Sequence, residues 1–310
     1  MSIVVLGAIF VDIKGYPAAA YIPGGRNMGY IEQVHGGVSR NVAEDIANVE
    51  LRPRFISVVD HSALGREVID RLNAHKVDTR FIRRVEDGMG TWLAVFNNNG
   101  DVEAAISKRP DLSEIGRILD EQGNEIFRDA DSVLLEIDME REQVKKVLYY
   151  AGKYHIPVYA AVSNMSIAVQ WRDQLQAVDC IVCNRQEAGI LFSEDYERLS
   201  VEEMRRRMAE RVKGANIRAM IITLGEKGAV FADREGNSGW CPAQKVAVKD
   251  TTGAGDAFFA GCAIGLTYGK SMMEACRIGT RLAASVITVT ENVCPRFRPE
   301  EFGITPPEME

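Results

Sequence analysis

Several features that would define other classes of protein are scarce in this sequence of 310 residues. The six cysteines are too few and too dispersed for the disulfide framework of a small secreted domain. No apolar run approaches the roughly 20 residues that a membrane-spanning helix needs. Basic residues are outnumbered, with 37 Lys and Arg against 44 Asp and Glu, a net charge of −7. This balance argues against a nucleic-acid-binding protein, which usually carries a basic patch.

Two local patterns could suggest other functions, and neither has the context that it needs. Cys180 and Cys183 form a C-x-x-C pair with no second pair and no His at ligand spacing, which favours a packed strand over zinc or redox chemistry. The apolar segment 2–12 lacks a basic lead-in and a small-residue cleavage site, which favours a buried first strand over a signal peptide. We therefore expect a cytoplasmic protein that acts on a small molecule and binds neither membrane nor nucleic acid.

What the sequence does have is an alternation of short β-rich segments with amphipathic helical patterns. The predicted strands are Ile3–Leu6, Phe55–Val59, Ser132–Leu135, Pro157–Ala161, Cys180–Cys183 and Met220–Thr223. The predicted helices are Asn41–Asn48, Leu64–Ala74, Arg141–Tyr154 and Val201–Val212. This alternation predicts an α/β fold with a mostly parallel central sheet that is covered on both faces. No linker or internal repeat divides the chain, so we expect a single domain over residues 1–310.

Two segments, approximately 13–35 and 90–107, interrupt this rhythm. The first is rich in Gly and Pro and contains an alternating stretch, Tyr30–Val34. The second predicts a hairpin with strands Thr91–Phe96 and Asp101–Ile106, joined by a turn that contains the Asn99-Gly100 pair. We expect both segments to form a small β-sheet that serves as a lid on the main domain.

The segment 250–261, DTTGAGDAFFAG, carries the strongest chemical signal. Gly253, Ala254 and Gly255 allow close backbone approach at the start of a helical pattern, where unpaired N–H groups favour an anion such as phosphate. Asp256 follows in the first turn, where a carboxylate could accept a proton from an attacking hydroxyl. This combination suits phosphoryl transfer. The structural alternative is a glycine turn in which Asp256 only caps the helix.

A second glycine-rich segment, Gly265–Ser271, looks like a phosphate loop but is one residue shorter than the G-x-x-x-x-G-K-[ST] pattern. Gly269 is expected to end one helix, and Ser271 with Glu274 to form the capping box of the next. No G-x-G-x-x-G follows the first strand, which argues against a dinucleotide-binding dehydrogenase.

The 250–261 segment resembles the C-terminal signature of the PfkB/ribokinase family of ATP-dependent sugar and nucleoside kinases. Residues 36–43, GGVSRNVA, match the N-terminal motif of that family, and Asn184–Glu187 and Thr223–Gly228 match weaker marks. The resemblance covers nearly the whole chain. It implies a ribokinase-like three-layer α/β/α domain with a small β-sheet lid, ATP as co-substrate, Mg²⁺, and in many members K⁺.

The resemblance implies a role for each matching position. Asp256 would be the catalytic base and Gly253, Ala254 and Gly255 the anion hole. The sugar hydroxyls would be held by Asp12, Gly36, Gly37 and Asn41. ATP would lie along Asn184, Thr223, Gly225 and Gly228, with Glu187 near Mg²⁺ through water. Asp250 and Thr252 match positions that bind a monovalent cation. Taken singly, these residues could instead be ordinary turn and helix caps.

Within the family, the N-terminal third is most similar to pseudouridine kinases, which makes pseudouridine the best prediction for the substrate and pseudouridine 5′-phosphate for the product. Three positions depart from that pattern: Phe10 stands where those kinases usually have Asn, Ala160-Ala161 replaces Asp-Pro, and 107–110 replaces an acidic segment. Ribokinase or another sugar kinase of the family is the alternative. An alternative of another class is a non-catalytic sensor. In this family the lids of two subunits often pair. A homodimer that forms through the lid is therefore one expectation, and a monomer is the alternative.

Overall fold

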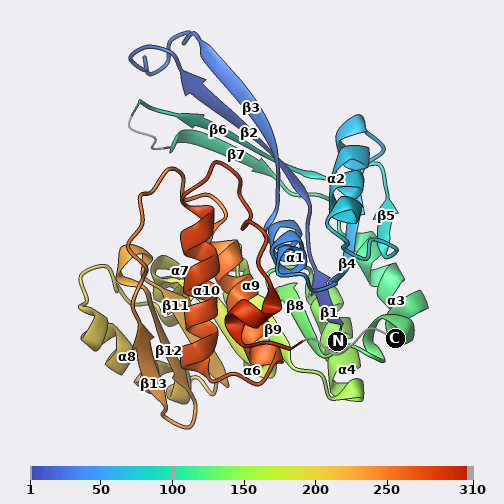
Figure 1. Cartoon of the computed structure of the whole chain (residues 1–310), viewed down its shortest axis with the longest axis vertical. Helices are drawn as coiled ribbons and strands as arrows, with labels where there is room; N and C mark the ends of the chain where they lie inside the picture. The colour runs from blue at the N-terminus through green and yellow to red at the C-terminus, as the bar shows by residue number, and fades with distance from the viewer. Residues whose placement is uncertain (1, 99–101, 306–310) are drawn as a thin grey trace.

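The computed structural model describes residues 2–98 and 102–305, and a nine-stranded sheet forms its centre (Figure 1). Its strand order is β13-β12-β11-β10-β9-β8-β1-β4-β5. The strands are β1 (Ile3–Leu6), β4 (Arg54–Val59), β5 (Ile82–Arg84), β8 (Ser132–Glu136), β9 (Val158–Ala161), β10 (Cys180–Asn184), β11 (Ala219–Thr223), β12 (Ala229–Asp233) and β13 (Ser238–Cys241). The pairs from β5 to β11 are parallel, and β12 and β13 continue the sheet antiparallel.

Helices cover both faces of this sheet because successive strand residues point to opposite sides. In β1, Val4 and Leu6 join one hydrophobic cluster and Ile3 and Val5 join the other. The first cluster includes side chains of α3 (Ser113–Phe127), α4 (Arg141–Tyr154), α5 (Met165–Ala168), α6 (Arg172–Ala177), α7 (Arg185–Phe192) and α8 (Val201–Gly214). The second includes side chains of α1 (Val38–Asn48), α2 (Ala63–Ala74), α9 (Ala254–Thr267) and α10 (Met272–Val286).

The predicted α/β class and the six predicted strands are confirmed, each within one or two residues at either end. The first predicted helix begins earlier, at Val38 rather than Asn41, because Gly37 with a φ of +97° ends the extended segment directly before it. Ser271 and Glu274 form the predicted capping box of α10, so the segment 265–271 is structural. Of the helices in residues 2–98 and 102–305, none has the length and apolar character to span a bilayer.

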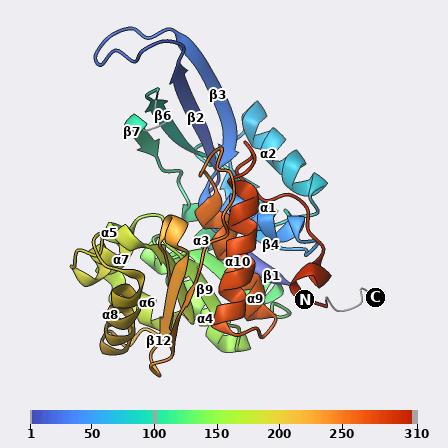
Figure 2. The ribbon, with the colours of Figure 1, turned by 60° about the vertical axis from the view of Figure 1, so that its left-hand side comes forward.

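A separate four-stranded sheet lies above the main domain (Figures 1 and 2). Its order is β3-β2-β6-β7, with β2 (Phe10–Pro17), β3 (Gly29–Gly36), β6 (Gly90–Phe96) and β7 (Val102–Lys108). The segments 13–35 and 90–107 supply most of these strands. The predicted hairpin turn extends over Asn99 and Gly100, which lie outside the described residues. We call these four strands the small sheet.

Candidate active site

The first turns of α1 and α9 meet below the small sheet, and their contact centres on Asp256. Asn41 Nδ2 donates a hydrogen bond of 2.7 Å to Asp256 Oδ2. Gly253, not Asp256, is the N-cap of α9, and no side chain caps this helix. Asp256 is therefore not a helix cap, and its carboxylate is available for another role.

Burial raises the pKa of Asp256 to about 7, against the opposing hydrogen bond from Asn41. The carboxylates of Glu136 and Asp12 raise the same pKa further. Asn41 is itself held, because Arg40 donates to Asn41 Oδ1 at 2.6 Å. A carboxyl group with a pKa near 7 changes its ionisation around neutral pH, which is the range that suits a general base.

Residue 253 must be glycine for two reasons. Its φ of +80° lies in the left-handed region, and a Cβ atom at this position would lie 2.0 Å from the carbonyl oxygen of Asn292. An α-helix leaves its first amides without a carbonyl partner inside the helix, and of those in α9 the Ala254 amide donates to the Thr251 carbonyl at 3.2 Å. The predicted anion hole of Gly253, Ala254 and Gly255 thus lies at a helix N-terminus, where the helix dipole favours an anion.

The residues predicted to hold a substrate lie on β2 and around the turn before α1. Asp12 is buried, and this burial raises its pKa to about 6 against the opposing charges of Lys14 and Arg40. A Cβ atom on Gly36 would lie 2.5 Å from the Asp12 carboxylate. The strands β2 and β3 can therefore approach closely at this carboxylate only because residue 36 is glycine.

Glu136, at the end of β8, is a buried carboxylate that the sequence did not single out. It accepts hydrogen bonds from the amides of Ala8 and Ser39, at 3.2 and 3.1 Å, and its other oxygen accepts from Ser163 Oγ at 2.9 Å. Burial raises the pKa of Glu136. This side chain connects the segment after β1, the first turn of α1 and the loop after β9. These hydrogen bonds hold the three segments together beside Asp256.

On the other side of α9 lies a pocket of about 760 Å³. Its lining combines Thr223, Gly225 and Gly228 with Ala254 and Gly255. Three of the residues predicted to lie along ATP and part of the predicted anion hole therefore share one cavity. An apolar wall completes it, and the sequence did not indicate these residues: Trp240, Val246, Val248, Ala283 and Ile287.

Asn184 and Glu187 form the capping box of α7. The Asn184 side chain accepts from the Glu187 amide, and one Glu187 carboxylate oxygen accepts from the Asn184 amide, at 2.8 and 2.7 Å. Within the described residues no group of three or more His, Cys, Asp or Glu side chains could hold a metal by itself. The oxygen donors present fit Mg²⁺, which normally keeps several waters and shares its other ligands with phosphates.

Asp250 and Thr252 lie at the same edge of the site. Asp250 Oδ1 accepts from the Thr252 amide and from Thr252 Oγ1, both at 2.8 Å. The Lys14 ammonium, which the sequence analysis did not single out, reaches them from the small sheet. It lies 3.3 Å from Thr252 Oγ1 and 3.8 Å from Asp250 Oδ2. A cation of the protein therefore stands beside the two positions predicted to bind a monovalent cation.

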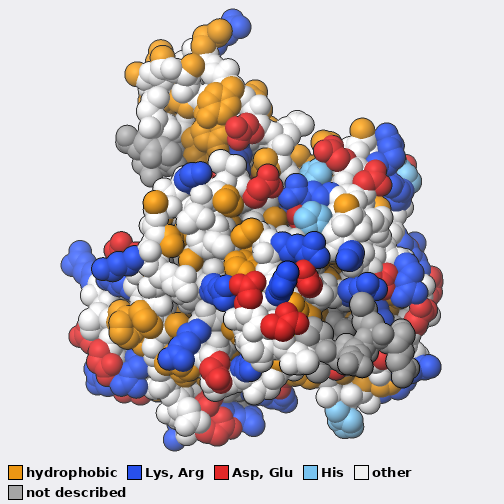
Figure 3. Space-filling model, in the orientation of Figure 1, with side chains coloured by type: hydrophobic (Ala, Val, Ile, Leu, Met, Phe, Trp, Pro, Cys, Tyr) orange, Lys and Arg blue, Asp and Glu red, His pale blue; other side chains and the backbone are white. Residues whose placement is uncertain are grey.

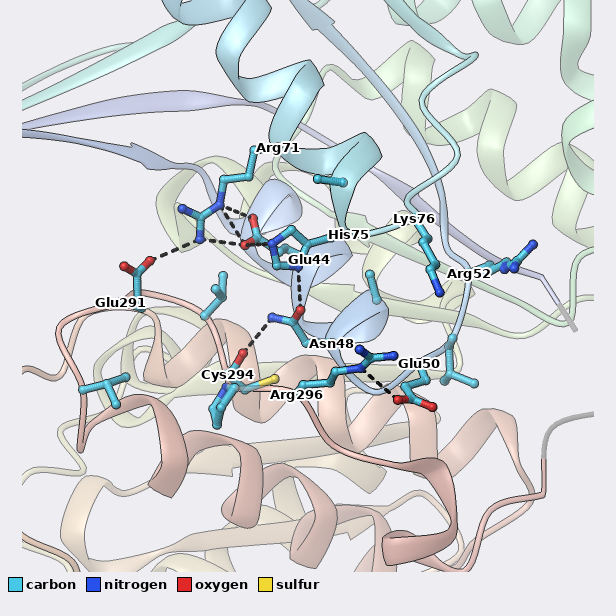
Figure 4. A pocket seen from close by; sticks show the side chains of 16 residues that line it. Glu44, Asn48, Glu50, Arg52, Arg71, His75, Lys76, Glu291, Cys294 and Arg296 are labelled. Carbon is cyan, nitrogen blue, oxygen red and sulfur yellow. Dashed lines mark hydrogen bonds and ion pairs between the residues drawn. The ribbon is translucent and has the colours of Figure 1, made fainter.

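A second pocket, of about 680 Å³, lies behind α1 (Figure 4). Glu44, which is fully buried, pairs there with Arg71 at 2.7 Å and, on its inner side, with Arg40 at 2.7 Å. Although burial opposes ionisation, these two cations hold the pKa of Glu44 below its usual value. Glu44 links this pocket to the candidate site, because it pairs with Arg40 and Arg40 in turn donates to Asn41.

Comparisons with known proteins identify the family of the chain. The sequence profile of the pfkB family carbohydrate kinases matches residues 1–293. The guanosine-inosine kinase of Exiguobacterium acetylicum is 35% identical over 294 residues, which are 94% of this chain and 96% of that protein. The pseudouridine kinase of Escherichia coli is 26% identical over 277 residues, 89% of this chain and 87% of that protein.

Solved kinase structures have a similar fold. The ribokinase of Arabidopsis thaliana, solved with ribose and ATP, superposes with a TM-score of 0.80 at 20% identity, over 97% of each chain. The chain belongs to the pfkB family of carbohydrate kinases. It is a sugar or nucleoside kinase, a phosphotransferase that has an alcohol group as acceptor.

Proposed function

We propose that this kinase acts on a nucleoside and transfers the γ-phosphoryl group of ATP to the hydroxymethyl oxygen of its ribose. The observation that carries the proposal is a row of aromatic rings on the face of the small sheet that also bears Asp12. Trp92 on β6 lies directly opposite Asp12 on β2, and Tyr30 on β3 lies directly opposite Tyr16 on β2. Tyr16 stacks on Tyr30 and on Phe96 with centroids 5.0 and 4.9 Å apart, and Trp92 meets Phe96 edge-on.

This row suits a nucleobase better than a free sugar. Residues i and i+2 of a strand share a face, so Asp12, Lys14 and Tyr16 point the same way, and Lys14 reaches the 250–252 segment below. A ribose whose hydroxyls bond to Asp12 would thus carry its base toward Trp92. Aromatic side chains recognise bases by stacking on their π-faces.

The candidate bases follow from the relatives. The guanosine-inosine kinase is the more similar of the two nucleoside kinases compared. This similarity supports a purine nucleoside as the substrate. Pseudouridine is the second candidate, supported by the residues 12–16 and 36–44 that follow the pattern of pseudouridine kinases. Phe10, whose ring packs over Gly90, replaces a polar residue of that pattern with an apolar one, which is why we place pseudouridine second.

In the proposed reaction, ATP lies in the 760 Å³ pocket, with its terminal phosphate at the first amides of α9. Asp256 accepts the proton of the substrate hydroxyl as its oxygen attacks phosphorus. Mg²⁺ near Glu187 neutralises phosphate charge when bound. The small sheet serves as a lid that excludes water and limits hydrolysis of ATP. The intact Asp256 site favours this enzyme over a non-catalytic sensor.

We also propose that the protein works in the cytoplasm and as a homodimer through the small sheet. All six cysteines are buried free thiols, as expected in a reducing compartment. The face of the small sheet turned away from the active site exposes Ile31, Leu93 and Ile106, and such a patch favours association.

The test is phosphorylation of a panel containing guanosine, inosine, pseudouridine, adenosine, uridine, ribose and fructose, with Mg²⁺ and with or without K⁺. We expect kcat/KM to be highest for guanosine or inosine. Asp256→Asn is the matched control, expected to lower kcat by about 10²–10⁴-fold without loss of the fold. Turnover of free ribose alone would refute the nucleoside assignment, and near-normal turnover by Asp256→Asn would refute the role of the base.

A further inference from the structure

Lys14 is an unusual residue for its position. It lies on β2 of the small sheet, yet only 5% of its surface is exposed and its ammonium group reaches across to the main domain. A buried charge is costly unless it is paired and hydrogen-bonded. The buried ammonium of Lys14 therefore requires an anionic partner.

The described partners of Lys14 satisfy this charge only in part. An ammonium group has three donors, and Lys14 Nζ makes one long hydrogen bond, 3.3 Å to the neutral hydroxyl of Thr252. The nearest carboxylate oxygen, Asp250 Oδ2, is 3.8 Å away. The other oxygen of Asp250 is already engaged by the amide and hydroxyl of Thr252.

The location of the ammonium indicates which anion it could meet. Thr252 directly precedes Gly253, the N-cap of α9, so Lys14 stands at the entrance of the predicted anion hole. On β2 it is two residues from Asp12, and its charge lowers the pKa of Asp12, which places it on the substrate side of that turn. A phosphoryl group that passes between the α9 amides and a substrate held at Asp12 would come within reach of Lys14.

We propose that the Lys14 ammonium binds the phosphoryl group during its transfer, as a fixed positive charge that the small sheet supplies. This inference rests on the proposed kinase reaction and adds a residue to it. The bond between the terminal phosphorus and the bridging oxygen of ATP breaks, ADP leaves, and a new bond forms to the substrate oxygen, whose proton passes to Asp256. Lys14 remains protonated throughout and exchanges no proton.

The position of Lys14 also links the positive charge at the predicted anion hole to closure of the small sheet over the main domain. Thr252 and Asp250 belong to the main domain, whereas Lys14 belongs to the small sheet, so the ammonium reaches the anion hole only when the sheet lies against α9. Electrostatic stabilisation of a transferring group is strongest where water is excluded. The site would thus be fully charged only when it is closed.

The test compares Lys14→Met, which keeps length and loses charge, with Lys14→Arg, which keeps charge. Lys108→Met is the matched control, because Lys108 lies on the opposite face of the same sheet and pairs with Asp87. We expect Lys14→Met to lower kcat/KM about 10²-fold, mainly through kcat, whereas Lys14→Arg retains part of the activity and Lys108→Met is normal. Methylammonium should partly restore kcat in Lys14→Ala.

Two kinetic outcomes would overturn the proposal. One is a Lys14→Met enzyme within twofold of the parent in kcat. The other is a loss that follows the melting temperature, raises KM for both substrates and is not restored by methylammonium, since Lys14 would then only hold the small sheet in place.

Binding separates this proposal from the proposed function. If the parent protein turns over no member of the panel, the nucleoside assignment fails, and calorimetry with a non-hydrolysable ATP analogue and Mg²⁺ still tests Lys14. We expect Lys14→Met to bind the analogue about threefold more weakly than the parent, a smaller loss than that in kcat, and Lys108→Met to bind it normally. Equal affinity of Lys14→Met and the parent, or no binding by the parent, would refute the phosphate role.

Discussion

At the scale of single residues, the site depends on how its carboxyl groups are held. Asp256 is partly buried, with one hydrogen-bond donor, Asn41, and with carboxylates nearby, and its pKa rises toward neutrality. Glu44 is more deeply buried, but two guanidinium groups surround it and its pKa falls. Burial alone therefore does not decide ionisation, and the neighbours do.

The hydrogen bond from Asn41 gives a prediction for the pH profile. In the parent enzyme, kcat/KM should rise with pH through a pKa near 7, as Asp256 loses its proton. Asn41→Ala removes a bond that lowers this pKa, so the rise should move to higher pH. Asn48→Ala is the control, because Asn48 lies on the same helix and bonds instead to the Cys294 carbonyl. An unmoved profile in Asn41→Ala would contradict this role of Asn41.

At the scale of elements, two helix starts and one small sheet create the site. α9 can begin tightly at Ala254 because Gly253 accepts a positive φ against the Asn292 carbonyl. The small sheet uses one face for Asp12, Lys14 and the aromatic row. Its other face exposes Ile31, Leu93 and Ile106. Figure 3 shows hydrophobic side chains gathered on the part of the molecule that the small sheet forms.

The exposed face gives a prediction about assembly. Ile31 and Ile106 are 74% and 71% exposed, and burying them between two copies would remove apolar surface from water. We expect the parent protein to sediment as a dimer and the double variant Ile31→Asp, Ile106→Asp to sediment as a monomer. Tyr149→Asp, at a comparably exposed site on α4, should leave the dimer intact. A parent protein that is monomeric at tens of micromolar would show that this face has another role.

At the scale of the whole molecule, the site reduces stability. The folded-state pKa of Asp256, about 7, exceeds the value near 4 of an unfolded chain. Such a group contributes stability that is fully present below pH 4 and is lost as pH rises through 7. Ionisation of Asp256 at neutral pH therefore opposes folding.

Asp256→Asn should remove this effect. We expect its free energy of unfolding to exceed that of the parent by a margin that grows between pH 4 and pH 8, to the order of a few kcal/mol. Urea unfolding at several pH values measures the margin. Asp250→Asn is the control, because the pKa of Asp250 is lowered rather than raised and its variant should show no such gain. A margin that does not change with pH would contradict the raised pKa of Asp256.

Local patterns in the sequence predicted six strands of the central sheet, four helices, the small sheet and the glycine turn before Asp256. Each of these features lies within one continuous segment of the chain. Strand alternation, helix periodicity and turn chemistry depend on residues that are neighbours in the sequence, so the sequence reveals them. The antiparallel strands β12 and β13 at the sheet edge were missed, since the short segments 229–233 and 238–241 have no clear alternation.

Only the tertiary structure decided which side chains meet. Lys14 reaches Thr252 across 238 positions of sequence, and Glu136 binds the amide of Ala8 across 128. Nothing local marks either residue, since a lysine in a strand and a glutamate at a strand end are ordinary. The sequence by itself determined that a helix begins at a glycine turn with a carboxylate in its first turn. Folding decided the charge around that carboxylate, because burial and distant neighbours set its pKa.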